Sequence, residues 1–552
     1  MEPMNKKNTL SKKICRNSLL LGTILLALPG SVLAAPSLPS THTPSLPEQP
    51  ATNLENNQAQ PAAPAIKARF TLQKIQVDAS GLDLSEARLE QQTRGFLGHE
   101  ITEKELGEAV QRVTLYCRQH GYPAAAAYLP SQKSGQGILT VKILPGRYGE
   151  IRVENQSKLS QHLVDGCLHG LKTGDIIQSK NLETALYNIS NLGGVQAAGM
   201  LSPGKTVGTS DITVRVKDGK QASYILYSEN YGSKSSGRYR YGLQGTWSDL
   251  DLHGDSLHIG GLLSNHDLRN YNIGYEKAVG HAGTRAGLSV SRMDYELGGV
   301  LKAIGAKGKA NTVSVYGTSP LWQTASSSQS ISYGYDYHDL CDDLDQYGLS
   351  AKKHSHVFHA GVNGRQRLGQ SSWAYDITAS MGSLMMDSDY ARTLESYSHT
   401  AGQFSKGVLS LNGQQPLGRD WDLQVKLQEQ KASRNLDSSE EIYLGGANAV
   451  RAYPQGEGSG DEGWQGTMEL RYHTHVPGLV LSSYLDGGHV KLSRDGESGG
   501  ETLKGWGLGI SYSQPGNWFA RFDYARRIGL CENASNEARS KARMWFMLGK
   551  VW

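Results

Sequence analysis

The chain has 552 residues with a formal net charge of +4, and 20% of its residues are charged. The positive excess lies within the first 34 residues, so the rest of the chain is near neutral, which excludes nucleic-acid binding through a basic surface. Five cysteines are far too few to hold a chain of this length together as a disulfide scaffold.

The first 34 residues predict a secretory signal peptide. Basic residues between positions 6 and 16 precede an apolar stretch, Leu19–Leu33, which is too short and wrongly flanked for a membrane helix. Cys15 precedes this stretch, so it is not a lipoprotein cysteine. Residues 35–65 are rich in proline, alanine, asparagine and glutamine, and they predict a linker.

Residues 66–145 and 146–219 predict two small α+β modules, each in the order strand, helix, helix, strand. Cys117 and Cys167 fall on their helices, where we interpret them as buried small apolar residues. In the first module we expect strand Phe70–Val77, helix Ser85–Phe96, a helix from the capping box Thr102–Glu105 to Gly121, and strand Leu139–Ile143. In the second we expect strand Ile151–Val153, helices Leu159–Leu168 and Leu182–Leu192, the latter capped by Ser179, and strand Ile212–Val216.

Residues 220–552 predict an all-β transmembrane barrel of about 16 antiparallel strands. Apolar and polar residues alternate with a period of two, as in Trp421–Gln428 and Gly505–Tyr512. A soluble sandwich has the same period. However, segments of about 10 residues with tyrosine or tryptophan near their ends are typical of strands that cross a bilayer at a tilt. Tyrosine (27 residues) far outnumbers phenylalanine (7).

The connections between these strands alternate between short and long, as in bacterial barrels. We expect the long ones to face outside, because both ends of the barrel should lie in the periplasm. Cys341 and Cys531 fall in two of them, on roughly opposite sides of the barrel, and whether they pair stays open. Short turns are expected near 249–254, 416–419, 477–478 and 515–517, and long polar connections near Cys341–Ser355, Asn435–Gly463, Lys491–Thr502 and Ile528–Ser540.

The last strand ends on an aromatic residue. Phe546, Leu548 and Trp552 share its apolar face, which Lys550 interrupts. Such an ending resembles the assembly signal of bacterial outer-membrane barrels, and we expect these residues to serve as one.

Three motifs accompany this organisation: Asn230-Tyr231-Gly232-Ser233 at the barrel entry, Val450-Arg451-Ala452-Tyr453 in the longest connection, and Tyr484-Leu485-Asp486-Gly487-Gly488 on a strand. With two POTRA-like modules ahead of a barrel, the chain resembles the outer-membrane transporters of two-partner secretion. These are the haemolysin-activator and filamentous-haemagglutinin secretion proteins of the outer-membrane-protein-85 superfamily. Members often begin with a helix that plugs the pore, but the composition of residues 36–65 predicts no such helix.

The resemblance implies that a lumenal loop at about 433–463 folds inside the barrel as a gate. Its gating residues would be Val450, Arg451, Ala452 and Tyr453, and Tyr484 and Asp486 would be their partners on the barrel wall. Physical chemistry agrees, because alternation puts Tyr484 and Asp486 on the inner face and arginine binds a carboxylate through two hydrogen bonds. Ala452 replaces the usual glycine, which restricts the backbone at the tip of the loop.

The resemblance also implies the function. The chain would sit in the bacterial outer membrane with its modules in the periplasm, and would export a large secreted partner of the TpsA type, unfolded and without ATP. That partner would be a haemolysin, an adhesin or a contact-dependent toxin. Other expected contacts are outer-membrane lipid and, during biogenesis, the barrel assembly machinery; we expect a monomer that binds no nucleic acid. The alternatives are an insertase of the same superfamily and a passive porin.

Other candidate chemistry is weak. His473 and His475 would share the inner face of one strand, but two ligands without a third rarely hold zinc, so we interpret them as lumen-lining polar residues. No phosphate-binding loop precedes a helix. We therefore predict no enzyme, no metal and no cofactor.

Overall fold

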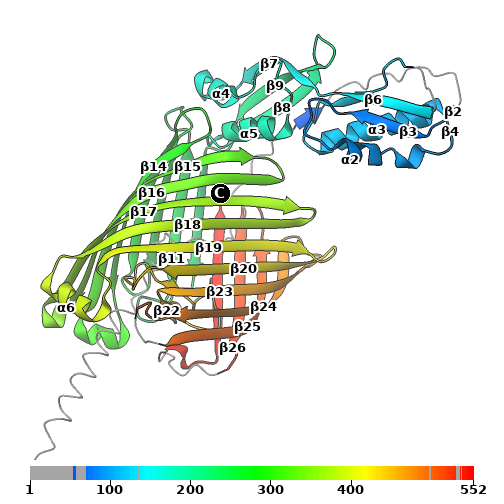
Figure 1. Ribbon diagram of the computed structural model, residues 1–552. Coiled ribbons are helices and arrows are strands. Elements are labelled where there is room, and N and C mark those ends of the chain that lie inside the picture. Colours follow the sequence, from blue (N-terminus) through cyan, green and yellow to red (C-terminus); the bar gives the residue numbers. More distant parts are fainter. Residues whose placement is uncertain (1–53, 57–69, 133–136, 496–498, 530–534, 536) are drawn as a thin grey trace, which may run out of the picture.

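The computed structural model describes residues 54–56, 70–132, 137–495, 499–529, 535 and 537–552. The predicted signal peptide, most of the predicted linker, and Cys531 lie outside these residues. Two small modules precede a closed barrel (Figure 1). Within the described ranges, no helix is long and apolar enough to cross a membrane.

The first module has a three-stranded sheet in the order β3-β6-β5, covered by helices. The capping box is confirmed, since Thr102 accepts a hydrogen bond from the Glu105 backbone and donates its own N–H to the Glu105 carboxylate at 2.8 Å. The expected first strand is divided in two, and β5 was not predicted. The elements are β2 (Phe70–Thr71), β3 (Lys74–Asp78), α2 (Glu86–Gln91), β4 (Glu100–Ile101), α3 (Glu103–Gln119), β5 (Ala126–Tyr128) and β6 (Ile138–Leu144).

The second module has the sheet order β1-β8-β9-β7. Its elements are β7 (Arg147–Asn155), α4 (Gln161–Leu168), α5 (Ser179–Ser190), β8 (Val195–Pro203) and β9 (Thr209–Asp218). The prediction of Ser179 as a cap is wrong, because α5 already begins at Ser179 and follows Gln178, which makes no side-chain cap. Strand β8 was missed because alanine and glycine are poor strand formers. Gly199 on β8 lets α5 pack closely on the strand, since a Cβ there would lie 2.9 Å from the Leu186 side chain.

Part of the predicted linker forms a strand. β1 (Leu54–Asn56) pairs in parallel with Gly199–Leu201 of β8, at the edge of the second sheet. The proline-rich composition of the linker did not predict this strand. The strand forms because the edge of the second module's sheet offers it hydrogen-bond partners.

The cysteines of the two modules are buried, as predicted. Cys117 and Cys167 lie on α3 and α4 within the apolar cores. Burial raises the pKa of both thiols to about 11, so both are protonated at neutral pH.

Sixteen strands of the described chain close into an antiparallel barrel, as predicted. β10 pairs with β27 to complete the ring. The strands are β10 (Ala222–Glu229), β11 (Arg240–Ser248), β12 (Ser256–Ser264), β13 (Arg269–Ala278), β14 (Arg285–Glu296), β15 (Ala306–Gln323), β16 (Ser327–Leu344), β17 (Leu349–Leu368), β18 (Ser371–Met386), β19 (Gly402–Pro416), β20 (Trp421–Ala432), β23 (Glu462–His473), β24 (Leu479–Lys491), β25 (Gly500–Ser513), β26 (Trp518–Arg527) and β27 (Ala542–Val551).

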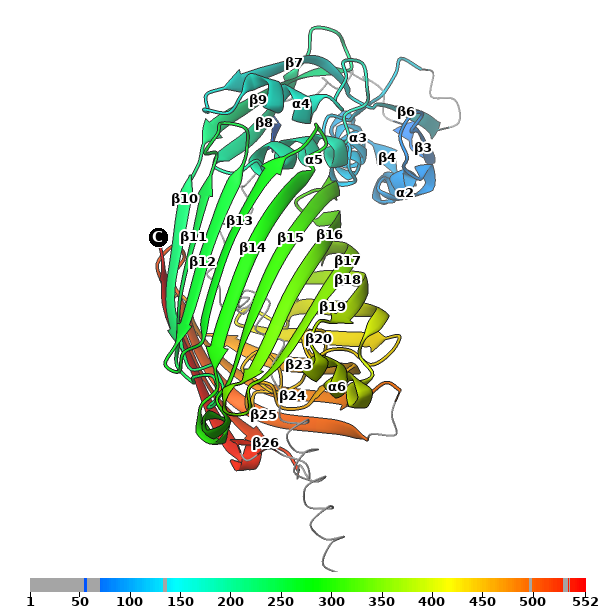
Figure 2. The same ribbon diagram turned by 90° about the vertical axis from the view of Figure 1, so that its left-hand side faces the viewer.

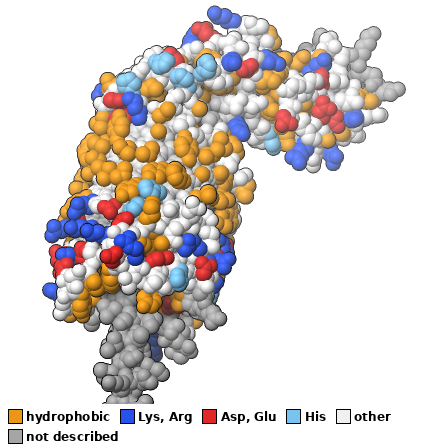
Figure 3. Space-filling view, turned by 60° about the vertical axis from the view of Figure 1, so that its left-hand side comes forward, with side chains coloured by type: hydrophobic (Ala, Val, Ile, Leu, Met, Phe, Trp, Pro, Cys, Tyr) orange, Lys and Arg blue, Asp and Glu red, His pale blue; other side chains and the backbone are white. Residues whose placement is uncertain are grey.

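On the face shown in Figure 3, the outer surface of the barrel carries an apolar belt, with charged side chains gathered beyond one edge of it. Alternation explains the belt. Phe358 on β17 is 62% exposed, whereas its neighbours Val357 and His359 point inward, and Val357 is buried. The inner face is rich in small polar residues such as Ser314 and Ser332. A wide exposed apolar surface of this kind marks a surface that contacts lipid or another protein.

Strands β15, β16 and β17 are 18, 18 and 20 residues long, well beyond the expected 10. The prediction of a long loop over Cys341–Ser355 is therefore wrong, because the connection spans only 345–348 and Cys341 lies on β16. The extended ends carry polar residues on both faces, so the sequence lacks the alternation that reveals a strand. A helix, α6 (Asp389–Ser398), lies between β18 and β19 and was also missed.

The second module rests on the rim formed by the short turns of the barrel (Figure 2). Asn191, just after α5, donates to the Gln323 side chain at 2.8 Å, and its carbonyl accepts from Arg285 at 2.9 Å. Glu183 on α5 accepts from the Ala325 backbone at 2.8 Å. These contacts place the second module at the end of the barrel where β10 begins and β27 ends.

Candidate functional site

The connection between β20 and β23, residues 433–461, folds back into the barrel; we call it the lumenal loop. Its stem is the strand pair β21 (Ile442–Tyr443) and β22 (Ser459–Gly460). The tip is a compact turn in which the Val450 backbone N–H donates to the Leu444 carbonyl at 2.7 Å. This turn aims the next side chain, Arg451, at the inner wall of the barrel.

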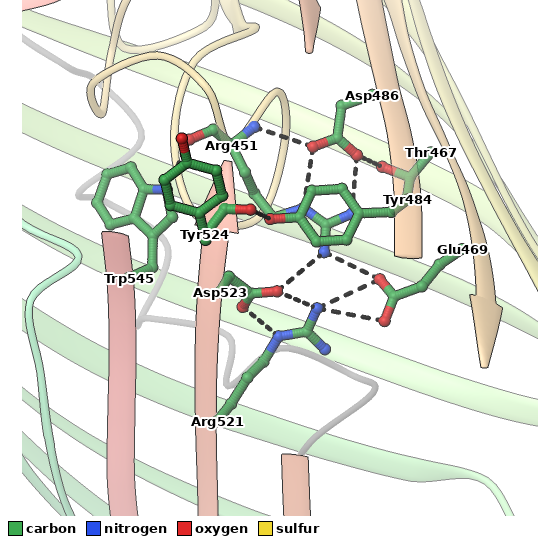
Figure 4. A network of polar contacts seen from close by, with 9 residues as sticks. All are labelled: Arg451, Thr467, Glu469, Tyr484, Asp486, Arg521, Asp523, Tyr524 and Trp545. Atoms are coloured by element: carbon green, nitrogen blue, oxygen red, sulfur yellow. Dashed lines mark hydrogen bonds and ion pairs between the residues drawn. The ribbon is translucent and has the colours of Figure 1, made fainter. Parts of the chain in front are cut away.

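The Arg451 guanidinium makes two parallel hydrogen bonds to Asp486 of β24, Nε to Oδ2 at 2.9 Å and NH2 to Oδ1 at 2.8 Å (Figure 4). The Arg451 backbone N–H also donates to Asp486, and Thr467 of β23 donates to the same carboxylate at 2.9 Å. The structure thus brings together the two residues that the motifs singled out. Two-point binding fixes the orientation of the guanidinium as well as its position.

Two more carboxylates and a second arginine complete the network, and the sequence analysis did not identify them as a site. Arg451 NH1 lies 2.9 Å from Glu469 of β23 and 3.4 Å from Asp523 of β26. Arg521 of β26 bonds to both carboxylates. Alternation does place all three on the inner face, since they oppose lipid-facing Met468 and Phe522.

All five charged side chains of the network are buried, the most exposed at 7%. Burying charge is costly, and removal of one member of a buried ion pair costs about 3–5 kcal/mol because its partners are left without a counter-charge. Three carboxylates surround two guanidinium groups, so removal of either arginine would leave one positive charge against three buried acids. The arrangement therefore holds the loop tip strongly in one place.

Aromatic residues contact both the guanidinium and the backbone of Arg451. The Tyr484 ring centroid lies 3.1 Å from the Arg451 guanidinium carbon, a cation–π contact. Trp545 of β27 donates its indole N–H to the Arg451 carbonyl at 2.7 Å, and Tyr231 packs edge-on against that indole. The entry motif, the loop tip and the last strand thus meet at one point.

Ala452 fits the tip without backbone strain. Among the described non-glycine residues, positive φ occurs only at Asp249, Leu252, Asp267 and His399. The buried Ala452 methyl group lies over Gly505 of β25, where a Cβ would be only 2.6 Å away. A glycine on the wall therefore makes room for the alanine on the loop.

Apolar contacts surround the polar network. Val450 and Tyr453 of the predicted gating motif are buried beside wall residues of β24 and β25. The members of this cluster are Ile442, Leu444, Val450, Ala452, Tyr453, Tyr484, Val490, Leu503, Ala525 and Ala538. The tip is thus held by packing as well as by charge.

The predicted assembly-signal residues Phe546, Leu548 and Trp552 all lie exposed on the outer face of the last strand or just beyond it. Lys550, which interrupts their face, has its ammonium 5.2 Å from the Trp518 ring and 5.0 Å from the Trp552 ring. Two aromatic faces at the end of the strand thus accommodate a charge on an otherwise apolar surface.

His473 and His475, which alternation placed on one face of the same strand, do not lie on the same strand. β23 ends at His473, which bonds to Asp422 of β20, whereas His475 lies in the following turn. Over the described ranges, no group of three His, Cys, Asp or Glu side chains could hold a metal ion.

Comparison with protein families gives two matches. Residues 208–512 match the family described as haemolysin secretion/activation protein ShlB/FhaC/HecB. Residues 70–146 match the ShlB-type POTRA domain. Together these matches cover the first module and most of the barrel, including the whole lumenal loop.

Two curated relatives align with this chain over most of their own length and most of its length. The chain is 26% identical over 499 residues to the heme/hemopexin transporter protein HuxB of Haemophilus influenzae, covering 88% of this chain and 87% of the relative. It is 23% identical over 467 residues to the outer membrane transporter CdiB of Dickeya dadantii, covering 82% and 81%.

Solved structures share the fold. CdiB from Escherichia coli aligns with a TM-score of 0.67 at 19% identity, covering 90% of this chain and 92% of that one. BamA from Haemophilus ducreyi aligns with a TM-score of 0.51 at 14% identity, covering 88% and 100%. The barrel with preceding modules is thus common to both, and the second similarity is weaker.

Proposed function

The chain belongs to the haemolysin secretion/activation protein family of outer-membrane transporters, and on that premise we propose how it recognises, admits and releases its secreted partner protein. Family membership makes it a transporter with POTRA domains at the periplasmic face. The rim that carries the second module is then the periplasmic rim, and the lumenal loop enters from the outside. The steps below are our proposal.

The partner arrives unfolded in the periplasm and docks on the modules by adding a strand to a sheet edge. This mode suits an unfolded chain because main-chain hydrogen bonds provide affinity before any fold exists. In support, β3 and β5 are the outer strands of the first sheet, and β7 is an outer strand of the second. The partner is a haemolysin, an adhesin or a contact-dependent toxin.

The docked chain then passes through the barrel once the lumenal loop has shifted. The observation that carries this step is the buried Arg451–Asp486 pair, which holds the loop tip against the wall of the lumen. Export uses no ATP, since the outer membrane has no nucleotide supply, so direction comes from folding of the partner outside. An insertase is the weaker candidate, because the family match is to secretion proteins and the similarity to BamA concerns the fold alone.

The docking step is tested by deleting residues 66–219 and measuring release of the partner encoded by the neighbouring reading frame. We expect secretion to be lost while the barrel still inserts, as shown by its heat-modifiable migration in outer-membrane fractions. Undiminished release from the shortened protein would exclude docking on the modules.

A further inference from the structure

We propose that the lumenal loop has a second anchor, formed by Asp437 and Glu440 of the loop with Lys353 and Lys406 of the wall, and that opening requires release of both anchors. This inference rests on the proposed gating function. It names residues outside every motif discussed above, on a part of the wall that Arg451 does not reach.

The first pair of this anchor joins the loop to β17. Lys353 Nζ binds Asp437 Oδ2, and the two side chains are only 14% and 8% exposed. The second oxygen of Asp437 accepts hydrogen bonds from Ser439, one from its backbone N–H at 3.1 Å and one from its hydroxyl at 2.8 Å. Ser439 and Lys353 thus bind both oxygens of the carboxylate and fix its orientation.

The second pair joins the loop to β19. Lys406 Nζ lies 2.6 Å from Glu440 Oε2, with side chains 16% and 10% exposed, and also donates to the Glu440 carbonyl at 3.1 Å. Gln430 of β20 donates to the same carbonyl at 2.9 Å. Both the backbone and the side chain of Glu440 are thus bound to the wall.

Apolar packing supports the two ion pairs. Leu436, immediately before Asp437, is buried against Val357 of β17 and Phe404 of β19. Its backbone N–H donates to Asp461 at 2.8 Å, where the loop returns to the wall. The first leg of the loop is therefore fixed along its length, and the ion pairs are shielded from water.

The two anchors lie on different parts of the barrel. Arg451 binds β23, β24 and β26, whereas Asp437 binds β17 and Glu440 binds β19 and, through Gln430, β20 (Figure 1). The loop is therefore fixed to the inner wall of the barrel at two places. Release of the tip alone would leave the first leg bound to the wall near the rim at which the loop leaves β20.

The test is single-channel conductance of the purified full-length protein in planar bilayers. Four variants are compared with the unchanged protein: Arg451→Ala, the pair Lys353→Met with Lys406→Met, all three changes together, and Lys431→Met. Lys431 is the matched control, because it is an exposed lysine on β20 that pairs only loosely with Glu429 at 3.9 Å. Heat-modifiable migration shows that each variant has folded.

We expect each anchor variant to open more often than the control, and the triple variant to open at least about tenfold more often than either. Exchanging the charges of the second pair, with Lys406→Glu and Glu440→Lys together, should return the open fraction toward that of the unchanged protein. Such rescue would not follow if the lysine change merely damaged the fold.

The outcomes separate the two proposals. If the paired lysine variant behaves like Lys431→Met, or the triple variant like Arg451→Ala alone, the second anchor is refuted and gating through Arg451 stands. If only the lysine variant opens, the second anchor stands and the role of Arg451 falls. If every variant stays closed, both are refuted.

Discussion

Arg451 is held by the geometry of its surroundings as much as by charge. Asp486 takes two guanidinium hydrogen bonds and the backbone N–H, Tyr484 covers one face, and Trp545 binds the carbonyl. A lysine at this position would supply a positive charge. It could neither form two parallel hydrogen bonds with Asp486 nor lay a planar group on the Tyr484 ring. The site therefore selects for arginine specifically.

The close contact between Ala452 and Gly505 predicts the effect of a substitution at Gly505. Gly505→Ala places a methyl group 2.6 Å from the Ala452 methyl, so the tip must shift, at a cost of about 1–3 kcal/mol. We expect a lower midpoint in urea unfolding and more frequent channel opening. Adding Ala452→Gly removes the clash and should restore most of both properties.

Gly487→Ala is the control for this pair, because the nearest atom to a Cβ at Gly487 is 3.9 Å away. If Gly505→Ala matched this control, or if Ala452→Gly gave no recovery, the close approach of loop and wall would be disproved.

Sequence motifs identified Arg451 and Asp486 because both stand in recognisable local patterns. Glu469, Asp523 and Trp545 stand in none. Alternation showed only that the two acids face inward. Which inward residues of β23, β24 and β26 meet depends on the stagger between strands, and this is not encoded in any single strand.

Of the strand pairings that form the barrel, the one that closes it, between β10 and β27, is the shortest. β10 and β27 pair over five residues, Ile225–Glu229 with Met547–Val551, whereas β10 and β11 pair over eight. The Asn230 side chain extends this seam, since its amide donates to the Met544 carbonyl at 3.0 Å and accepts from the Phe546 N–H at 2.8 Å. The Asn230 backbone N–H also donates to the Phe546 carbonyl at 3.2 Å, so the side chain adds to a backbone contact at this end of the seam.

We predict that Asn230→Ala weakens the seam. Two hydrogen bonds of about 0.5–1.5 kcal/mol each are lost, and two backbone groups of β27 are left without a partner. The temperature at which the barrel loses its compact migration on gels should fall. Asn412→Ala on the inner face of β19 is the comparison, and an equal effect of both changes would contradict a special role for Asn230.

Elements with a clean alternation were predictable, whereas those with polar residues on both faces were not. Short turns and the capping box of α3 were found from local signals. The outer halves of β15 to β17 and helix α6 were not, because above the lipid both faces of a strand meet water and the pattern disappears. Likewise, pairing of Leu54–Asn56 with β8 depends on a sheet edge that lies about 145 residues further along the chain.

At the scale of the whole molecule, the even number of strands returns the chain to the rim from which it started. Trp552 and Tyr224 exchange backbone hydrogen bonds there, next to the second module. Connections at the other rim include α6 and the entry to the lumenal loop, and Asn435 donates to the Ser398 carbonyl at the end of α6. The two rims therefore face different compartments.

This topology predicts where a tag becomes accessible. An epitope inserted within α6, after Tyr397, which is 78% exposed, should be stained by antibody on intact cells. The same epitope placed after Trp552 should be stained only once the outer membrane has been permeabilised. Staining of the second tag on intact cells would reverse the assigned orientation.

An even strand number also constrains how this molecule gains new parts over evolution. Any domain added before β10 or after β27 stays within the cell envelope, where it meets cargo and the cell's own folding machinery. Only insertions between strands at the far rim meet antibodies, phages and neighbouring cells. Additions that face the periplasm and additions that face the cell exterior therefore accumulate in separate stretches of the chain.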